Sequence, residues 1–382
     1  MRFPEFHGEW CVSTIGEQFD LYSGNTPSRL NKEHFEGNVN WITSGELKEH
    51  YISDTKEKIS EDAATANNLK LLHPGTFVIA IYGLEADGVR GTGSITCKES
   101  TISQACMAFT QKGDVKNEFL YSWYKKHGNI IGIKYAQGTK QQNLSYDILE
   151  KFHIAYPSQD EQDKLIKFIS LLDERIASQS KLIEKLESLI KGIVDCTILR
   201  KEKNAIVGDV CSISEQIRAE ANIDDIITVR LHGNGVCKSS AENLQLGATQ
   251  YYRRRAGQLI YGKQNFHNGA IGIVPISLDN GITSKDIPSF DIDEMKCNSV
   301  YLLAQLQSPQ YYKPAEALTT GTGSKRLKEE TFLKLPIVLP NKREQDNIAV
   351  LIHRASMNLD HAKRLLELLS IQKQFLLRQM FI

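Results

Sequence analysis

The side chains best suited to chemistry in this sequence are polar and basic groups in segments rich in Gly, Asn and Pro, which are typical of loops. Arg and Lys can bind phosphates and guanine, whereas Asn and Gln can form paired hydrogen bonds with adenine. We therefore treat these side chains as candidate DNA contacts, although each taken singly is equally compatible with a solvated surface. The candidates are Asn25, Thr26, Ser28, Arg29, Arg90, Gly138, Thr139, Gln141, Gln142, Asn143, Arg230, His232, Arg253, Arg254, Lys263, Asn265, His267, Lys285, Gly321, Thr322, Ser324, Lys325 and Arg326.

Two Gly-Thr segments are the strongest candidates in this set. They read GTKQQNL at residues 138–144 and GTGSKRL at residues 321–327. A glycine lets the backbone come close to a phosphate, and each segment carries Gln or basic side chains beside it. We expect both segments to form loops that contact DNA.

Motifs for catalysis are weak by comparison. Asp279 or Asp286 with Glu294 and Lys296 imitates the acids and lysine of a metal-dependent nuclease, which is one alternative function. Residues 257–264 (GQLIYGKQ) resemble a phosphate-binding loop but lack its Ser or Thr, so we predict a strand between two turns. The sequence contains neither an N-P-P-[YF] nor a D-P-P-[YF] motif for adenine methylation. We therefore expect no catalytic residue, metal site or cofactor on this chain.

Composition indicates an ordinary cytoplasmic protein. The 382 residues are enough for two domains, and 46 Lys and Arg balance 46 Asp and Glu. Attraction to phosphate must therefore come from local clusters or from partner proteins. The seven cysteines are scattered without a C-x-x-C pair, which favours reduced thiols, and no apolar run is long enough to cross a membrane.

An internal repeat with a constant offset organises the whole chain. The segment at 138–144 matches 321–327, and PSQDEQD at 157–163 matches PNKREQD at 340–346, in each case 183 positions later. A repeat of this length that occurs only twice indicates a duplicated domain and not a solenoid. Ser158 with Glu161, and Asn341 with Glu344, have the spacing of a capping box at a helix start, which we prefer to a catalytic role for the two glutamates.

Each capping box is followed by a heptad stripe, interrupted only by Gln179 in the first copy and Lys373 in the second. A narrow stripe of this length predicts a two-helix coiled coil, and we expect the two helices to pair antiparallel as a spacer. The alternatives are that each helix packs on its own domain or on a second copy of the chain. The expected contacts are Leu165, Ile169, Leu172, Ile176, Ile183, Leu186, Ile190, Ile193, Ile348, Ile352, Ala355, Leu359, Ala362, Leu366, Leu369, Leu376 and Met380.

The remaining segments predict two α+β domains of different sequence. Apolar and β-branched runs at 76–82, 226–231, 259–261, 270–276 and 299–303 predict strands of mixed sheets. We place domain 1 at residues 1–157, a central spacer helix at 158–203, domain 2 at 204–340 and a C-terminal spacer helix at 341–382. Two dissimilar domains on one duplicated frame suggest an asymmetric target.

This organisation resembles the specificity subunits of Type I restriction-modification systems. The resemblance rests on two dissimilar domains, each closed by a Gly-Thr loop, a Pro-x-x-x-Glu-Gln segment and a heptad helix, and it covers the whole chain. It implies two target recognition domains that read a bipartite site in double-stranded DNA. It also implies two modification subunits and restriction subunits as partners, which would use S-adenosylmethionine, ATP and magnesium. A coiled-coil adaptor that binds only protein is the remaining alternative.

Overall fold

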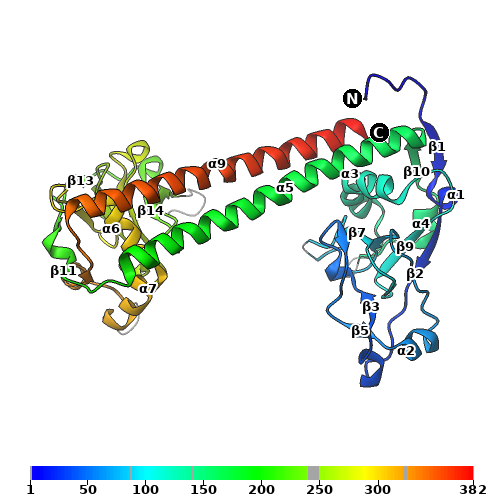
Figure 1. Ribbon diagram of the computed structural model, residues 1–382, viewed down its shortest axis with the longest axis horizontal. Helices are drawn as coiled ribbons and strands as arrows, with labels where there is room; N and C mark the ends of the chain where they lie inside the picture. Colours follow the sequence, from blue (N-terminus) through cyan, green and yellow to red (C-terminus); the bar gives the residue numbers. More distant parts are fainter. Residues whose placement is uncertain (1, 87, 139–141, 240–248, 322–324, 382) are drawn as a thin grey trace. The chain divides into compact units, whose positions relative to one another are not determined.

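The computed structural model describes residues 2–86, 88–138, 142–239, 249–321 and 325–381 (Figure 1). The chain divides into two compact units, unit 1 (residues 1–178 and 365–382) and unit 2 (residues 179–364). Two long helices, α5 (Gln159–Val194) and α9 (Lys342–Met380), each contribute one half to each unit. The predicted domains 1 and 2 belong to units 1 and 2. Within the described ranges, no helix is both long and apolar enough to cross a membrane.

Domain 1 is built on mixed sheets covered by helix α3 (Asn117–Tyr135). The apolar face of α3 packs on the central sheet, where the ring centroids of Tyr124 and Phe77 lie 5.7 Å apart. The five-stranded sheet has the order β2 (Phe19–Ser23), β9 (Cys106–Gln111), β6 (Phe77–Ala80), β7 (Gly93–Thr96), β4 (Tyr51–Ile52). The smaller elements are β5 (Lys58–Ile59), β3 (Val39–Ile42) and β8 (Ser100–Ile102) in one sheet, β1 (Cys11–Thr14) paired with β10 (His153–Tyr156), and helices α1 (Ile15–Gln18), α2 (Glu61–Ala66) and α4 (Tyr146–Glu150).

Outside the repeated segments, domain 2 has different sheets with a different strand order. Its four-stranded sheet has the order β12 (Cys211–Ile213), β20 (Ser289–Ile292), β17 (Leu259–Tyr261), β18 (Ile271–Ile273). The other strands are β13 (Arg218–Ala219), β16 (Tyr251–Arg253) and β19 (Ile282–Ser284) in one sheet, β14 (Ile227–Val229) paired with β15 (Val236–Lys238), and β11 (Ala205–Ile206) paired with β21 (Pro336–Ile337). The short helices are α6 (Ser299–Leu306), α7 (Pro309–Tyr312) and α8 (Glu329–Leu333). The predicted α+β class and the predicted strand at 259–261 are confirmed.

The predicted strand at 299–303 is wrong, because this segment forms α6. Asn298 caps the helix, and its side-chain oxygen accepts hydrogen bonds from the backbone amides of Val300 and Tyr301 at 3.0 and 3.2 Å. The buried residues Tyr301, Leu302, Gln305 and Leu306 lie on one helical face. A short apolar run fits a buried helix as well as a strand, and here the cap decides between them.

The repeat is visible in the structure at the predicted offset of 183 residues. An isolated β-bridge joins Gln137 to Asn143 in domain 1, and another joins Thr320 to Arg326 in domain 2. Helix α4 starts at 146 and α8 at 329, β10 at 153 and β21 at 336, and α5 at 159 and α9 at 342. The duplicated frame therefore runs without a gap from the Gly-Thr segment into the long helix.

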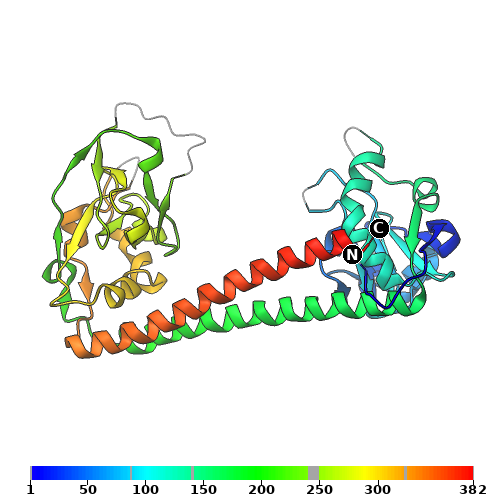
Figure 2. The same cartoon turned by 90° about the horizontal axis from the view of Figure 1, so that it is seen from above.

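The heptad stripes form the predicted antiparallel helix pair within each unit (Figures 1 and 2). In unit 1, Leu165, Ile169 and Leu376 join the core of domain 1, and in unit 2 Ile348 and Ile352 pack with Val194. The remaining predicted seam residues are buried or half-buried along both helices. Pairing within one chain thus accounts for the stripes, and a second copy is not needed.

The two polar interruptions of the stripes are also satisfied. Gln179 Nε2 donates to the carbonyl of Ala362 at 3.1 Å in unit 2. Lys373 Nζ lies 2.5 Å from Asp173 Oδ1 in unit 1. Polar groups in a helix seam are tolerated when they find such partners, and they fix the register of the pair.

The predicted capping boxes are only partly formed. The Asn341 side chain accepts a hydrogen bond from the Glu344 amide at 3.0 Å, as expected for a cap. The two glutamates, however, do not complete the boxes, because Glu161 accepts a 2.7 Å hydrogen bond from Arg2 and Glu344 forms an ion pair with Lys201. Glu161 is only 1% exposed. A carboxylate buried to this extent is stabilised by a charged partner such as Arg2.

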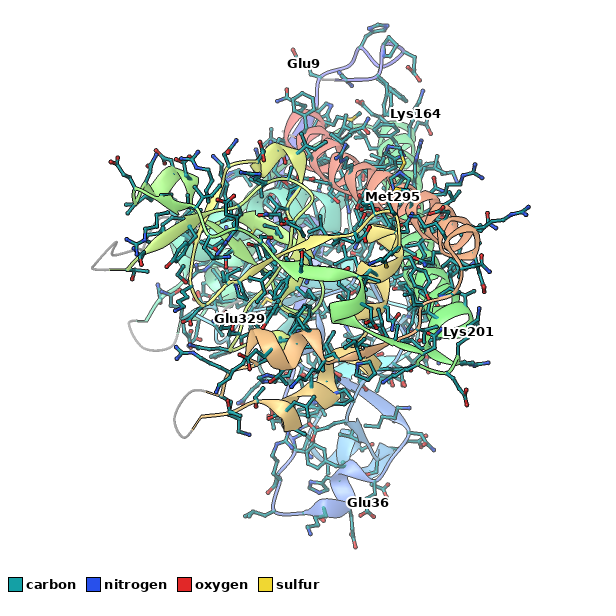
Figure 3. All side chains as sticks on the ribbon, turned by 90° about the vertical axis from the view of Figure 1, so that its left-hand side faces the viewer. Glu9, Glu36, Lys164, Lys201, Met295 and Glu329 are labelled. Carbon is teal, nitrogen blue, oxygen red and sulfur yellow. The ribbon has the colours of Figure 1, made fainter. Side chains whose placement is uncertain are left out.

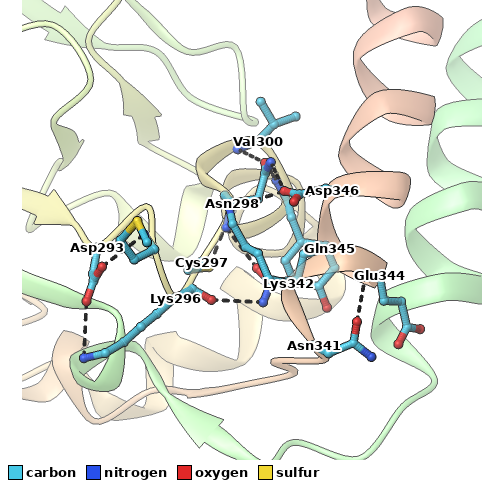
Figure 4. Close-up of polar contacts among 12 residues, drawn as sticks. Asp293, Lys296, Cys297, Asn298, Val300, Asn341, Lys342, Glu344, Gln345 and Asp346 are labelled. Carbon is cyan, nitrogen blue, oxygen red and sulfur yellow. Dashed lines mark hydrogen bonds and ion pairs between the residues drawn. The ribbon is translucent and has the colours of Figure 1, made fainter.

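The neighbouring glutamines, Gln162 and Gln345, join each long helix to its domain. In unit 2, Gln345 Oε1 accepts from the Asn298 amide at 2.9 Å, and its Nε2 donates to the carbonyls of Lys296 and Pro340 (Figure 4). In unit 1, Gln162 bonds in the same way to the Lys116 amide at 3.0 Å and to the carbonyls of Asp114 and Pro157. Each side chain is at most 1% exposed. We call these two groups the glutamine clamps.

We predict that Gln345→Leu, which preserves volume, lowers the free energy of unfolding of unit 2 by about 1–3 kcal/mol, the cost of a buried amide left without an acceptor. Urea denaturation of the full chain measures this change. Gln374→Leu on the exposed face of α9 is the matched control and should have little effect. Equal stability of the two variants would show that the clamp does not hold the helix to domain 2.

Candidate nucleic-acid interface

Each Gly-Thr segment is attached to the end of a central strand of its domain. The Leu144 amide donates to the Ile81 carbonyl next to β6, and the Leu327 amide donates to the Lys263 carbonyl next to β17, both at 2.9 Å. Gly138 and Gly321 have φ values of 108° and 130°, which residues with a side chain rarely adopt. The sequence thus needs glycine where each loop leaves the sheet. The predicted contacts Thr139, Gln141, Thr322 and Ser324 lie outside the described residues.

In domain 2 the segment forms one wall of a cleft with a positive lining, which we call the basic cleft. Its volume is about 810 Å³. The sequence predicted four of its residues, Lys263, Lys285, Gly321 and Arg326, from distant parts of the chain. The complete lining is Lys263, Lys285, Asp286, Thr320, Gly321, Arg326, Lys328 and Glu329, so four basic side chains face two acidic ones.

The two acidic residues hold part of this basic surface in place. Lys263 Nζ lies 2.7 Å from Glu329 Oε1, and Arg326 lies 3.2 Å from Asp286. Glu329, labelled in Figure 3, begins α8. Its burial is the largest single influence and opposes ionisation, but the hydrogen bond from Lys263, a backbone hydrogen bond and the charges of Lys263 and Lys285 together lower its pKa. The carboxylate is therefore charged at neutral pH, and it orients Lys263 without cancelling the charge excess of the cleft.

Lys328 is a member of the basic cleft that the sequence did not predict. It directly follows the second Gly-Thr segment and is exposed immediately before α8. The signal was available, because the residue lies one position beyond the repeated stretch. Lysine at such a place can pair with a phosphate as a point charge.

The equivalent region of domain 1 is less basic. Arg90 donates to the side-chain oxygen of Gln142 at 2.6 Å, and the Gln142 amide donates to Glu85 at 2.8 Å. This backbone hydrogen bond lowers the pKa of Glu85. Asn143 forms the bridge to Gln137. The structure therefore brings together the predicted residues Arg90, Gln142 and Asn143, with amide groups in place of most of the lysines of domain 2.

The predicted residues near Asn25 form a separate group in domain 1. Arg29 donates two hydrogen bonds of 2.8 Å to Glu57, and its guanidinium lies 5.0 Å from the centroid of the Phe35 ring. Asn25 accepts a hydrogen bond from the Thr26 amide at 2.8 Å, and Ser28 is exposed. The ion pair with Glu57 therefore offsets part of the charge that Arg29 could offer to a phosphate.

Arg254 is a correction, because it cannot contact DNA from its place in the fold. Its side chain is 0% exposed. The guanidinium donates to Thr283 at 2.7 Å and to Ser289 and the Ile287 carbonyl at 2.9 Å. Burial lowers its pKa to about 10, so it stays charged at neutral pH. Arg254 joins β16 and β19 to β20, whereas its sequence neighbours Arg253 and Arg255 are exposed.

The other candidates of domain 2 are distributed over several loops. His232 lines a different pocket beside Glu187 and Leu359 of the long helices, which removes it from the basic cleft. Lys325 pairs with Glu316 at 3.6 Å. The remaining predicted residues are exposed or half-buried in the turns around β14 and β17, and they are Arg230, Asn265 and His267.

The nuclease-like residues do not form a metal site. Asp279 accepts a hydrogen bond from the Ala256 amide at 2.8 Å, Asp286 pairs with Arg326, and Lys296 lies 3.3 Å from Asp293. Throughout the described part of the chain, no three His, Cys, Asp or Glu residues are grouped to hold a metal. The geometry therefore gives no support to the nuclease alternative.

Comparison with known proteins identifies the repeated frame. Residues 7–188 match the family model described as Type I restriction modification DNA specificity domain. This stretch of the chain is similar to that domain. The match contains domain 1, its Gly-Thr segment and most of α5, so the resemblance predicted from the sequence is confirmed.

Proteins of similar sequence include specificity subunits of Type I restriction enzymes. The MjaIX specificity subunit of Methanocaldococcus jannaschii is 28% identical over 47% of this chain and 42% of its own length. The MjaVIII specificity subunit of the same organism is 20% identical over 91% of this chain and 87% of its own length. The crystal structure of a Type I S subunit from M. genitalium has the same fold, with a TM-score of 0.64, 15% identity and coverage of 100% of this chain and 99% of that one.

We predict that Lys328→Gln weakens DNA binding by the complete complex to a similar extent for all sequences. It should also lower the slope of log affinity against log salt by about 0.9, the value for one lost phosphate contact. Affinity measured across a salt series tests this. Lys313→Gln, an exposed lysine of the same domain outside the cleft, is the control. An unchanged slope for Lys328→Gln would exclude the residue from the interface.

Proposed function

We propose that the chain is the non-catalytic specificity subunit of a Type I complex and reads a bipartite, asymmetric site in double-stranded DNA. The observation that carries this proposal is the duplicated frame, because it holds two domains whose main sheets have different strand orders. Each domain presents its own Gly-Thr segment from the end of a central strand. Two different reading surfaces on one repeated frame favour two different short sequences separated by an unread gap.

Methylation and cleavage are assigned in this proposal to other subunits. Two modification subunits would use S-adenosylmethionine, and restriction subunits would use ATP and magnesium, while this chain holds no cofactor. The support is chemical, because the sequence has no adenine methylation motif. The net charge of zero also favours shared DNA binding, since a neutral chain gains little from phosphate attraction alone.

The long helices provide surfaces for such partners. Their seams are used inside each unit, yet each unit keeps a second, exposed apolar stripe on α9. In unit 1, Leu368 and Phe375 are 62% and 51% exposed, and in unit 2 Val350 and Met357 are 48% and 47% exposed. The members of each pair are seven residues apart, which suits an apolar heptad helix of another chain. We assign these stripes to the modification subunits.

The proposal predicts that the purified chain alone neither methylates nor cuts DNA when S-adenosylmethionine, ATP and magnesium are supplied. Methylation should appear when modification subunits are added, and Leu368→Glu should reduce assembly by placing a charge in the apolar contact. Size-exclusion chromatography and methyl transfer measure the two effects.

Gln374→Glu is the matched control on α9, because it adds the same charge at an exposed polar position. It should assemble and support methylation normally. Turnover by the chain alone would refute the non-catalytic assignment. Normal assembly of Leu368→Glu would remove the stripe of unit 1 from the partner interface.

A further inference from the structure

A histidine is enclosed between two tyrosines where domain 1 meets the long helices in unit 1. The His50 ring stacks on Tyr121 with centroids 3.9 Å apart and on Tyr51 at 4.1 Å, with interplanar angles of 0° and 7°. The backbone is also fixed, since the Ile95 amide donates to the His50 carbonyl at 2.8 Å. Two aromatic faces favour a positively charged ring between them.

Both nitrogens of this ring face carboxylates from different elements. His50 Nε2 lies 2.8 Å from Glu118 Oε2 of α3, and Nδ1 lies 3.7 Å from Asp173 Oδ2 of α5. Asp173 in turn pairs with Lys373 of α9 at 2.5 Å. The line Glu118–His50–Asp173–Lys373 therefore connects domain 1 with both long helices. Only the doubly protonated imidazole carries a proton toward both carboxylates.

The charges around His50 favour its protonated form. Burial opposes protonation, but the hydrogen bond with Glu118 and the negative charges of Glu118 and Asp173 together outweigh it and raise the pKa of His50. The other ionisable groups that face the cluster are Lys373, Glu49, Tyr51, Tyr121 and Lys125. Burial lowers the pKa of Lys125 to about 8. Three carboxylates and two lysines thus surround the ring, and of these Glu118 and Asp173 are its direct partners.

The second half of the chain lacks this arrangement at the equivalent positions. With the offset of 183, Asp173 corresponds to Ser356 and Lys373 to Ile190. Ser356 and Ile190 line the pocket of about 490 Å³ beside domain 2. The charged line is therefore a property of unit 1 and is no requirement of the duplicated frame.

We propose that protonated His50 is a positioning residue that fixes domain 1 on α5 and α9. Its stabilising contribution is fully present below the ordinary pKa of 6.5 and is lost as the pH rises through the raised value. The consequence for DNA rests on the proposed function. Reading by domain 1 should weaken at alkaline pH, whereas reading by domain 2 should not weaken for this reason.

The test uses the full-length chain with isotope-labelled histidines, and His50→Gln assigns the His50 signal. We expect His50 to titrate above 6.5 in the wild type and closer to 6.5 in Asp173→Asn. Hydrogen exchange of α9 residues 365–380, corrected for the intrinsic rate at each pH, reports the junction. Protection should fall between low and high pH, about tenfold for every pH unit by which the measured midpoint of His50 exceeds the ordinary value.

His73→Gln is the matched control, because His73 lies in the same domain with a side chain 84% exposed. It should keep the wild-type pH dependence of the junction, whereas His50→Gln should abolish it. An ordinary or lowered pKa for His50, or equal pH dependence in both variants, would overturn the proposal. A pH-dependent junction in a complex that binds no DNA at any pH would refute the proposed function and leave the positioning role intact.

Discussion

The attachment of each domain to the long helices depends on a buried side-chain amide, which must have hydrogen-bond partners for its oxygen and its nitrogen. Gln162 and Gln345 meet this need only where a long helix begins next to the start of a domain helix, α3 or α6. A small rotation of the domain would leave buried donors and acceptors unpaired, which costs more than most surface contacts contribute. The two clamps therefore attach two different domains to the long helices in the same way.

The sequence predicted the parts of this fold that repeat or follow a period. The offset of 183 residues, the heptad seams and the Gly-Thr loops needed only counting, because each reflects a local rule of backbone geometry. The role of the clamp glutamines was missed, since their partners at Asp114 and Lys296 lie about 50 residues away in the chain. Arg254 was misjudged for the same reason, because burial of an arginine depends on contacts that sequence spacing does not reveal.

The two domains place different chemical groups around their Gly-Thr segments. Domain 2 gathers Lys263, Lys285, Arg326 and Lys328 around its loop, whereas domain 1 places Arg90 and Gln142 there. The junctions differ as well, with a charged line through His50 in unit 1 and an open pocket in unit 2. Under the proposed function, shared attachment with independent surfaces would allow one half of the recognised sequence to change while the frame is preserved.

The central claim is that the domains read DNA independently, and exchange of residues 1–157 for the corresponding domain of a related specificity subunit tests it most directly. The boundary precedes α5, so Gln162 and the helix pair are kept, and the incoming domain must supply the backbone partners that Asp114, Lys116 and Pro157 provide here. Methylation-aware sequencing of the host genome then reports the recognised motif. The account predicts that one half of the motif changes and that the other half and the gap are retained. A change in both halves would contradict it.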